Sequence, residues 1–206
     1  MAPMFSPEPR PEESAGALLA RHGALLLSLA RASIASRLSD ETVMAYETDG
    51  LAPELTAPGA VFVTLTEAGQ LRGCIGTAVA WRPLVEDVIG NAAASALEDA
   101  RFAPLSRGEL GRIAIALSLL SPPEPLAAAS EAALLAALVP GRDGLILSEG
   151  RRKSLFLPQV WEHLPEPRDF VAQLKRKAGL AELHWSTTLA FHRFTAASVE
   201  EPGARH

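Results

Sequence analysis

The residues that could do chemistry lie in the segment Leu71-Arg72-Gly73-Cys74-Ile75-Gly76-Thr77, which holds the only cysteine of the 206-residue chain. Side chains alternate between the faces of a strand, so a strand here would place Arg72 and Cys74 on one face, roughly 7 Å apart. A nearby cation favours the thiolate, which is the reactive form of cysteine. Gly73 and Gly76 remove bulk on both sides of Cys74, as glycines do where a ligand or another backbone comes close.

A second interpretation of the same segment is purely structural. Free cysteine is commonly a small buried residue, and a buried structural cysteine is inert. The glycines would then only let the following helix pack closely. The residues alone leave both interpretations open.

The helix expected after this segment, opened by Pro83 and reaching about Glu98, carries a polar row within or beside its apolar stripe. The row consists of residues four positions apart, namely Asn91, Ser95 and Asp99. Burying such groups without partners would cost a few kcal/mol. The row therefore needs hydrogen-bond partners in the core or in a ligand.

Arg72 and Arg101 are the expected partners of Asp99, whereas Glu86 and Asp87 are expected to point to solvent. An Asp99 ion pair could simply fix the helix to the hairpin, or it could help to position a ligand, since buried polar networks serve both purposes.

Hydrophobic periodicity predicts helices mixed with hairpins and no steady βαβ repeat, which indicates an α+β fold. The expected helices are residues 14–38, 83–98, 131–139, 158–164 and 167–178, and the expected strands are 60–66, 71–80, 112–121, 145–149, 154–157 and 189–195. Ser106 and Glu109 have the spacing of a capping box. Residues 1–13 and 200–206 are expected to be tails around one domain at 14–199.

The composition disfavours several classes of protein. A formal net charge of -5 makes nucleic-acid binding improbable despite two short basic runs. The five histidines show no ligand spacing, so no metal site and no cofactor is predicted. The absence of a signal peptide, of an apolar run long enough to span a bilayer and of a cysteine pair predicts a cytoplasmic protein away from membranes.

The segment at 71–77 resembles the LRGCIG signature of the AMME chromosomal-region protein family, whose bacterial members belong to the AmmeMemoRadiSam system. Further blocks that resemble the family run in order over roughly residues 14–199, including Asn91-Ala92, Asp99, Arg101-Phe102, Phe156–Trp161 and Lys175–Leu180. Asp143-Gly144 is similar to the bacterial form, whereas eukaryotic relatives tend to have histidine at the first position.

The resemblance implies an AMMECR domain of two intimate lobes, with mixed or antiparallel sheets flanked by helices. It also implies partners, a Memo-like protein and a radical SAM enzyme, but no settled reaction. The candidate catalytic residues are Cys74 as nucleophile, Arg72, Asp99 and Arg101, and the candidate ligand-binding residues are Gly73, Gly76, Asn91, Ser95 and Lys177. A cysteine-dependent enzyme component and a non-enzymatic binding module for a small molecule or partner both remain open.

Overall fold

The computed structural model describes residues 11–39 and 50–202, which form two compact units. Unit 1 comprises the chain up to Leu120 and the segment from Ala197 onward, and unit 2 spans Ser121–Ala196. Helices and antiparallel strand pairs occur in both, so the predicted α+β class is confirmed.

Unit 1 is built on a four-stranded sheet with the strand order β10-β5-β2-β3 and a two-stranded ribbon of β1 and β4. Its elements are α1 (Pro11–Leu38), α2 (Pro53–Thr56), β1 (Pro58–Gly59), β2 (Val61–Glu67), β3 (Gln70–Gly76), β4 (Arg82–Pro83), α3 (Leu84–Leu97), the short 3-10 helix η1 (Arg107–Glu109), β5 (Ile113–Leu120) and β10 (Ala196–Glu200). The last strand was not predicted, and β3 ends at Gly76 rather than at Ala80.

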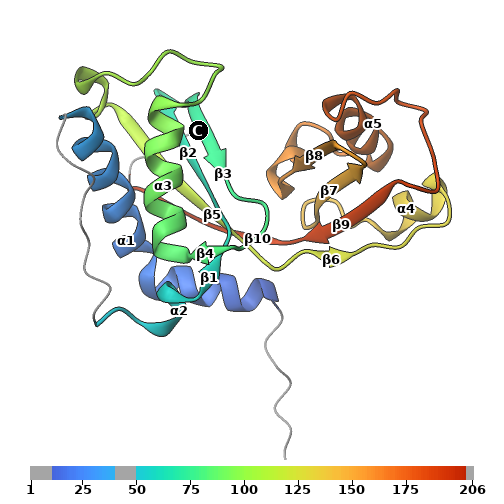
Figure 1. Ribbon diagram of the computed structural model, residues 1–206, viewed down its shortest axis with the longest axis horizontal. Coiled ribbons are helices and arrows are strands. Elements are labelled where there is room, and N and C mark those ends of the chain that lie inside the picture. Colours follow the sequence, from blue (N-terminus) through green and yellow to red (C-terminus); the bar gives the residue numbers. More distant parts are fainter. Residues whose placement is uncertain (1–10, 40–49, 203–206) are drawn as a thin grey trace, which may run out of the picture. The chain divides into compact units, whose positions relative to one another are not determined.

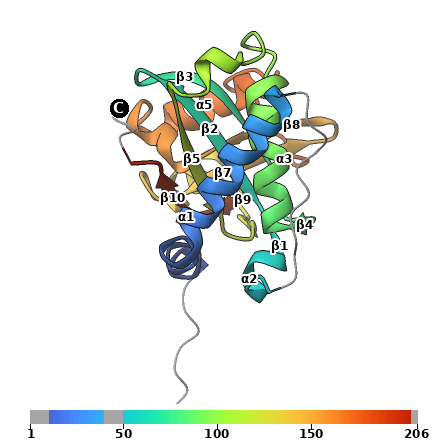
Figure 2. The same cartoon turned by 90° about the vertical axis from the view of Figure 1, so that its left-hand side faces the viewer.

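Helices α1 and α3 pack on each other and on one face of this sheet (Figures 1 and 2). The predicted apolar stripe of α3 is buried, and it meets the inward side chains of β2 and β5. That stripe consists of Leu84, Val85, Val88, Ile89, Ala92 and Ala96. The side chains of β2 alternate between buried and half-exposed positions, and the helices cover the face that carries the buried ones.

The stretch Ala15–Leu38 of α1 is long and apolar enough to cross a membrane, so the expectation that no such stretch exists was wrong. In the structure its side chains join the core of unit 1, where Leu26, Ala30 and Ile34 are almost fully buried. It is therefore packed as a core helix.

The predicted tails contribute to the fold where they are described. Helix α1 begins at Pro11, three residues before the predicted start at Ser14, while residues 1–10 lie outside the described part. The Glu201 carboxylate accepts hydrogen bonds from Arg31 Nε at 2.6 Å and from the Ile115 backbone N–H at 2.9 Å. The segment after β10 is thus tied to α1 and β5.

Unit 2 holds a second antiparallel sheet with the order β6-β9-β7-β8 and its own core. Its elements are β6 (Glu124–Pro125), α4 (Glu131–Ala137), β7 (Gly144–Glu149), β8 (Arg152–Phe156), the 3-10 helix η2 (Pro158–Glu162), α5 (Pro167–Lys177) and β9 (Ala190–Phe194). The Trp161 ring stacks on Phe170 at a centroid distance of 3.8 Å. Asp143 is buried and accepts a hydrogen bond from the Val139 N–H at 3.0 Å, so it closes the turn before β7.

The closest approach between α3 and β3 in unit 1 depends on Gly73. A Cβ at this position would overlap the backbone carbonyl oxygen of Ser95. A backbone oxygen within a helix cannot rotate away as the end of a long side chain can. Only glycine therefore permits this packing distance.

Replacing Gly73 with alanine is expected to lower the free energy of unfolding by about 1–3 kcal/mol, because the helix and the strand must separate. Gly111→Ala is the matched control, since a Cβ there would meet nothing within 4 Å. Urea denaturation measures both variants. Equal stability of Gly73→Ala and the wild type would contradict the close approach described above.

Candidate functional site

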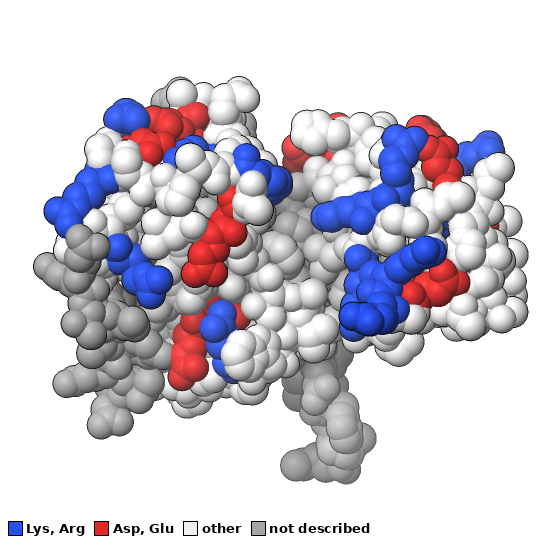
Figure 3. Space-filling view, turned by 45° about the horizontal axis from the view of Figure 1, so that its top comes forward, with Lys and Arg blue, Asp and Glu red and all other residues white. Residues whose placement is uncertain are grey.

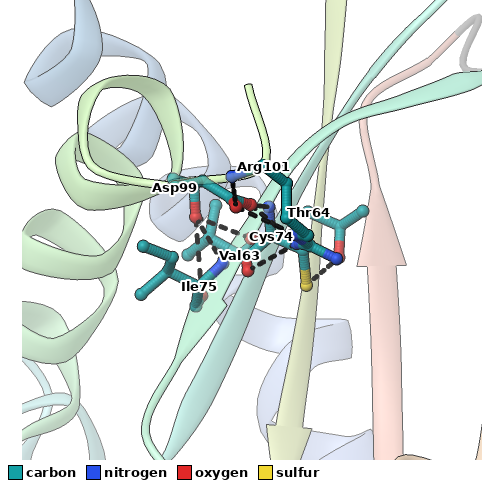
Figure 4. Close-up of polar contacts among 7 residues, drawn as sticks. Val63, Thr64, Cys74, Ile75, Asp99 and Arg101 are labelled. Atoms are coloured by element: carbon teal, nitrogen blue, oxygen red, sulfur yellow. Dashed lines mark hydrogen bonds and ion pairs between the residues drawn. The ribbon is translucent and has the colours of Figure 1, made fainter. Parts of the chain in front are cut away.

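Cys74 lies in the edge strand β3, and its side chain is half-exposed. Gly73 faces α3, so alternation turns the Cys74 side chain to the opposite face of the sheet. There its Sγ accepts a hydrogen bond from Thr64 Oγ1 at 3.4 Å, and Thr64 is its register partner in β2 (Figure 4). The sulfur is therefore neither fully buried nor without a partner.

The backbone of Cys74 is held by an ion pair on the free edge of β3. Its N–H donates to Asp99 Oδ2 at 2.8 Å, and its carbonyl oxygen accepts from Arg101 Nη2 at 3.2 Å (Figure 4). Edge strands expose unpaired backbone groups, and this pair satisfies both groups at Cys74. The position of the thiol is thus fixed by two side chains from the loop after α3.

The Asp99–Arg101 pair is bidentate, which confirms one of the two partners predicted for Asp99. Arg101 Nε donates to Oδ1 at 2.9 Å and Nη2 donates to Oδ2 at 2.6 Å. The hydrogen bond from Arg101, followed by that from the Cys74 N–H, holds the pKa of the Asp99 carboxyl well below its usual range despite opposing desolvation. The same pairing raises the pKa of Arg101, and the Cys74 thiol adds to that increase.

Arg72 pairs with Glu109 instead of Asp99, so that part of the prediction was wrong. Its Nε donates to Glu109 Oε1 at 2.8 Å. The predicted capping box is confirmed, because Glu109 also accepts from the N–H and Oγ of Ser106, both at 2.7 Å. Arg72 and these donors lower the pKa of Glu109 to about 2. The register between β2 and β3 shifts at Arg72, which pairs with no residue of β2, so the regular alternation predicted from Arg72 to Cys74 is interrupted there and does not set the direction of the Arg72 side chain.

The polar row of α3 satisfies the backbone of the β2–β3 hairpin. Ser95 Oγ donates to the Val63 carbonyl oxygen at 2.8 Å and accepts from the Ile75 N–H at 2.9 Å. Val63 and Ile75 are register partners, so one hydroxyl serves both strands. Asn91 Nδ2 makes similar contacts, to the carbonyl oxygen of Val61 at 3.0 Å.

Asp87 extends this row, although it was expected to point to solvent. It is fully buried, with Oδ2 accepting from the Val61 N–H at 2.9 Å. Its Oδ1 accepts from Thr77 Oγ1 at 2.7 Å and from Arg82 Nε at 2.8 Å. Asp87 is four residues before Asn91, so the spacing of the row was the signal that could have identified it.

The space beside each of the two glycines around Cys74 is occupied by other atoms of the protein. The Cβ position of Gly73 is taken by the Ser95 carbonyl, and that of Gly76 overlaps atoms of Phe62. The structural interpretation accounts for both glycines. Their ligand-binding role stays a prediction.

Lys177 belongs to unit 2, where it ends α5. Its Nζ donates to the Leu155 carbonyl oxygen at 2.9 Å and lies 5.1 Å from the centroid of the Phe156 ring. Other Lys and Arg side chains also gather on the surface of this unit (Figure 3). The Lys177 side chain therefore covers part of the edge strand β8 and bonds one of its backbone carbonyl groups. Its part in ligand binding is untested.

Taken together, unit 1 brings a thiol, two guanidinium groups and two carboxylates to one end of β3. Within the described ranges, no three His, Cys, Asp or Glu side chains are grouped as metal ligands. Sequence reasoning missed Glu109 as a member of this group and Thr64 as the partner of the thiol. The sequence identified Glu109 only as a residue of a helix cap. The contact of Thr64 with Cys74 depends on the register of the two strands, which the sequence alone does not give.

The stability contributed by Glu109 is expected to depend on pH. Its folded pKa of about 2 lies below the ordinary glutamate pKa of 4.5, so the contribution is complete above about pH 4.5 and is lost as the pH falls towards 2. The difference in unfolding free energy between the wild type and Glu109→Gln should therefore shrink over that interval. Urea denaturation at a series of pH values measures it, with Glu98→Gln as the control at an exposed carboxylate. A constant difference down to pH 2 would argue against the Arg72–Glu109 pair.

Comparison with known proteins gives one consistent family. The AMMECR1 family model matches residues 27–199. A Thermofilum pendens protein is 36% identical over 197 residues, covering 88% of this chain and 90% of its own, and a Thermotoga maritima protein is 39% identical over 136 residues, covering 65% and 73%. The crystal structure of uncharacterised protein PH0010 from Pyrococcus horikoshii has 34% identity and a TM-score of 0.82, covering 88% of this chain and 92% of that one. Since the relatives span archaea and bacteria and match most of the chain, this protein belongs to the AMMECR1 family.

Proposed function

We propose that this protein is a component of an enzyme system in which Cys74 is the nucleophile. The observation that carries the proposal is the half-exposed Cys74, whose backbone N–H is held by Asp99 and whose carbonyl oxygen is held by the Arg101 guanidinium. A fixed backbone limits the motion of the reacting sulfur.

No described histidine of unit 1 has a hydrogen bond to Cys74. Cysteine nucleophiles are commonly activated by histidine. His22, the described histidine of unit 1, instead contacts Glu54 Oε1 at 3.3 Å. We therefore assign the protein a role as one component, with the proton acceptor being solvent or a group on a partner.

The partners that fit this role are a Memo-like protein and a radical SAM enzyme, as the family resemblance implies. A cytoplasmic location belongs to the same proposal. A reducing compartment keeps a half-exposed cysteine as a free thiol.

A non-enzymatic binding module is the second candidate, and exposed apolar residues close to the signature favour it. Leu71 begins the segment and is 44% exposed, and Trp81 in the loop after β3 is 69% exposed. Exposed tryptophan is frequent at the centre of protein interfaces. In this case the hairpin would recognise a partner without a covalent step.

Cys74→Ser distinguishes the two candidates in a strain that lacks the native gene and depends on the pathway. If Cys74 is the nucleophile, turnover should fall by at least about a hundredfold, because a hydroxyl is a far weaker nucleophile at neutral pH. Thermal unfolding checks that the variant is folded. Full activity of Cys74→Ser would rule out the nucleophile.

The binding module predicts the opposite sensitivity. Trp81→Ala should reduce co-purification of partner proteins under native conditions, while Cys74→Ala leaves it unchanged. Leu183→Ala is a suitable control, since Leu183 is an exposed apolar residue of unit 2. Identical co-purification of the wild type and Trp81→Ala would count against this candidate.

A further inference from the structure

Two guanidinium groups lie over the ring of Phe102, close to Cys74. The Cζ atom of Arg72 is 5.9 Å from the ring centroid, and that of Arg101 is 5.5 Å from it. Arg72 is two residues before Cys74 in β3, and Arg101 donates to the Cys74 carbonyl oxygen. Because the face of an aromatic ring attracts cations, Phe102 helps to hold both arginines at the end of the strand that carries the thiol.

Only part of the donor capacity of these arginines is used within the protein. Arg72 donates through Nε alone, to Glu109, and its two terminal nitrogens donate to no oxygen of the described residues. Arg101 donates to Asp99 through Nε and Nη2, and Nη2 also donates to the Cys74 carbonyl oxygen. Its Nη1 donates to no oxygen in the described ranges. Within the described ranges, three nitrogens of the two arginines at Phe102 thus donate to no protein oxygen.

The carboxylate partners prepare these donors for a ligand. Glu109 and Asp99 fix the planes of the two guanidinium groups, so an incoming group does not have to order two long side chains. The Arg72 side chain is only 15% exposed, which limits competition from water. A planar fork of N–H donors matches the oxygens of a carboxylate or a phosphate.

We propose that the substrate of the Cys74 site carries an oxyanion, either a carboxylate or a phosphate, which Arg72 and Arg101 bind beside the sulfur. This inference rests on the proposed function of Cys74 as the reacting group, and it adds the chemical class of the substrate. Phe102 is then a positioning residue that keeps the two guanidinium groups together.

Alkylation of the single cysteine tests the proposal with two reagents that differ in charge. The Cys74 sulfur attacks the methylene carbon of iodoacetate or iodoacetamide, forming an S–C bond while iodide leaves with the C–I electron pair and the thiol proton passes to the buffer. Both reagents react with the same thiolate, so the ratio of their rates reports recognition of the carboxylate and not the acidity of the thiol. Intact mass spectrometry follows the labelling.

The iodoacetate-to-iodoacetamide rate ratio of the folded protein should exceed that of N-acetylcysteine amide by about tenfold, the scale of one charge-assisted hydrogen bond. Arg72→Gln should lose most of that excess. Arg101→Lys, which retains a cation for the buried Asp99, should lose part of it. Arg21→Gln in α1 is the control of equal charge change and should keep the wild-type ratio.

Competition distinguishes the two oxyanions. Inorganic phosphate or acetate, each added during labelling with iodoacetamide, should slow the reaction of the wild type and not that of Arg72→Gln. The more effective of the two identifies the preferred group. Added NaCl should reduce the iodoacetate preference, because salt screens the attraction.

A rate ratio that is unchanged in both Arg72→Gln and Arg101→Lys would overturn the proposal. So would a folded protein in which neither reagent labels Cys74, because a substrate could not then reach the sulfur. Full pathway activity of Cys74→Ser would rule out Cys74 as the nucleophile. The rate ratio is measured on the wild-type protein and its arginine variants, so it does not depend on that result. Failure of the proposed function and failure of this inference are therefore separate results.

Discussion

The contact between the polar row of α3 and the backbone of the β2–β3 hairpin is the constraint on which the rest of unit 1 depends. Asp87, Asn91 and Ser95 enter a core that is otherwise apolar, and each bonds a backbone group of the hairpin. Left unpaired, each side chain would cost about 1–3 kcal/mol, so helix and hairpin specify each other. Gly73 is the steric condition for this contact, because any larger residue would meet the Ser95 carbonyl.

The same contact determines where the chemistry can lie. With the Gly73 face directed to α3, the Cys74 side chain has to emerge on the opposite face of the sheet. The loop that follows α3 then returns Asp99 and Arg101 to the edge of β3, where they hold the Cys74 backbone. The signature segment therefore combines a structural face and an accessible face, and its glycines belong to the first.

Charge in this region is organised in pairs. Arg72 has Glu109 and Arg101 has Asp99, so each guanidinium group keeps its charge and its orientation, while part of its donor capacity meets no oxygen in the described part of the chain. Such pairs stabilise the loop after α3, and they orient the guanidinium groups as the proposed anionic substrate requires. The structural and functional interpretations of the signature are thus compatible, because they concern different atoms of the same residues.

Local pattern was sufficient for the α+β class, the apolar stripe of α3, the capping box at Ser106 and the alternation that separates Cys74 from Gly73. These features depend on residues close together in the chain, so the sequence by itself determined them. The partner of Arg72, the Val61 N–H as the partner of Asp87 and the contact of Thr64 with the sulfur were decided only by tertiary structure. Each joins segments ten or more residues apart, and helical or strand periodicity does not specify which of several oppositely charged side chains a long arginine will reach.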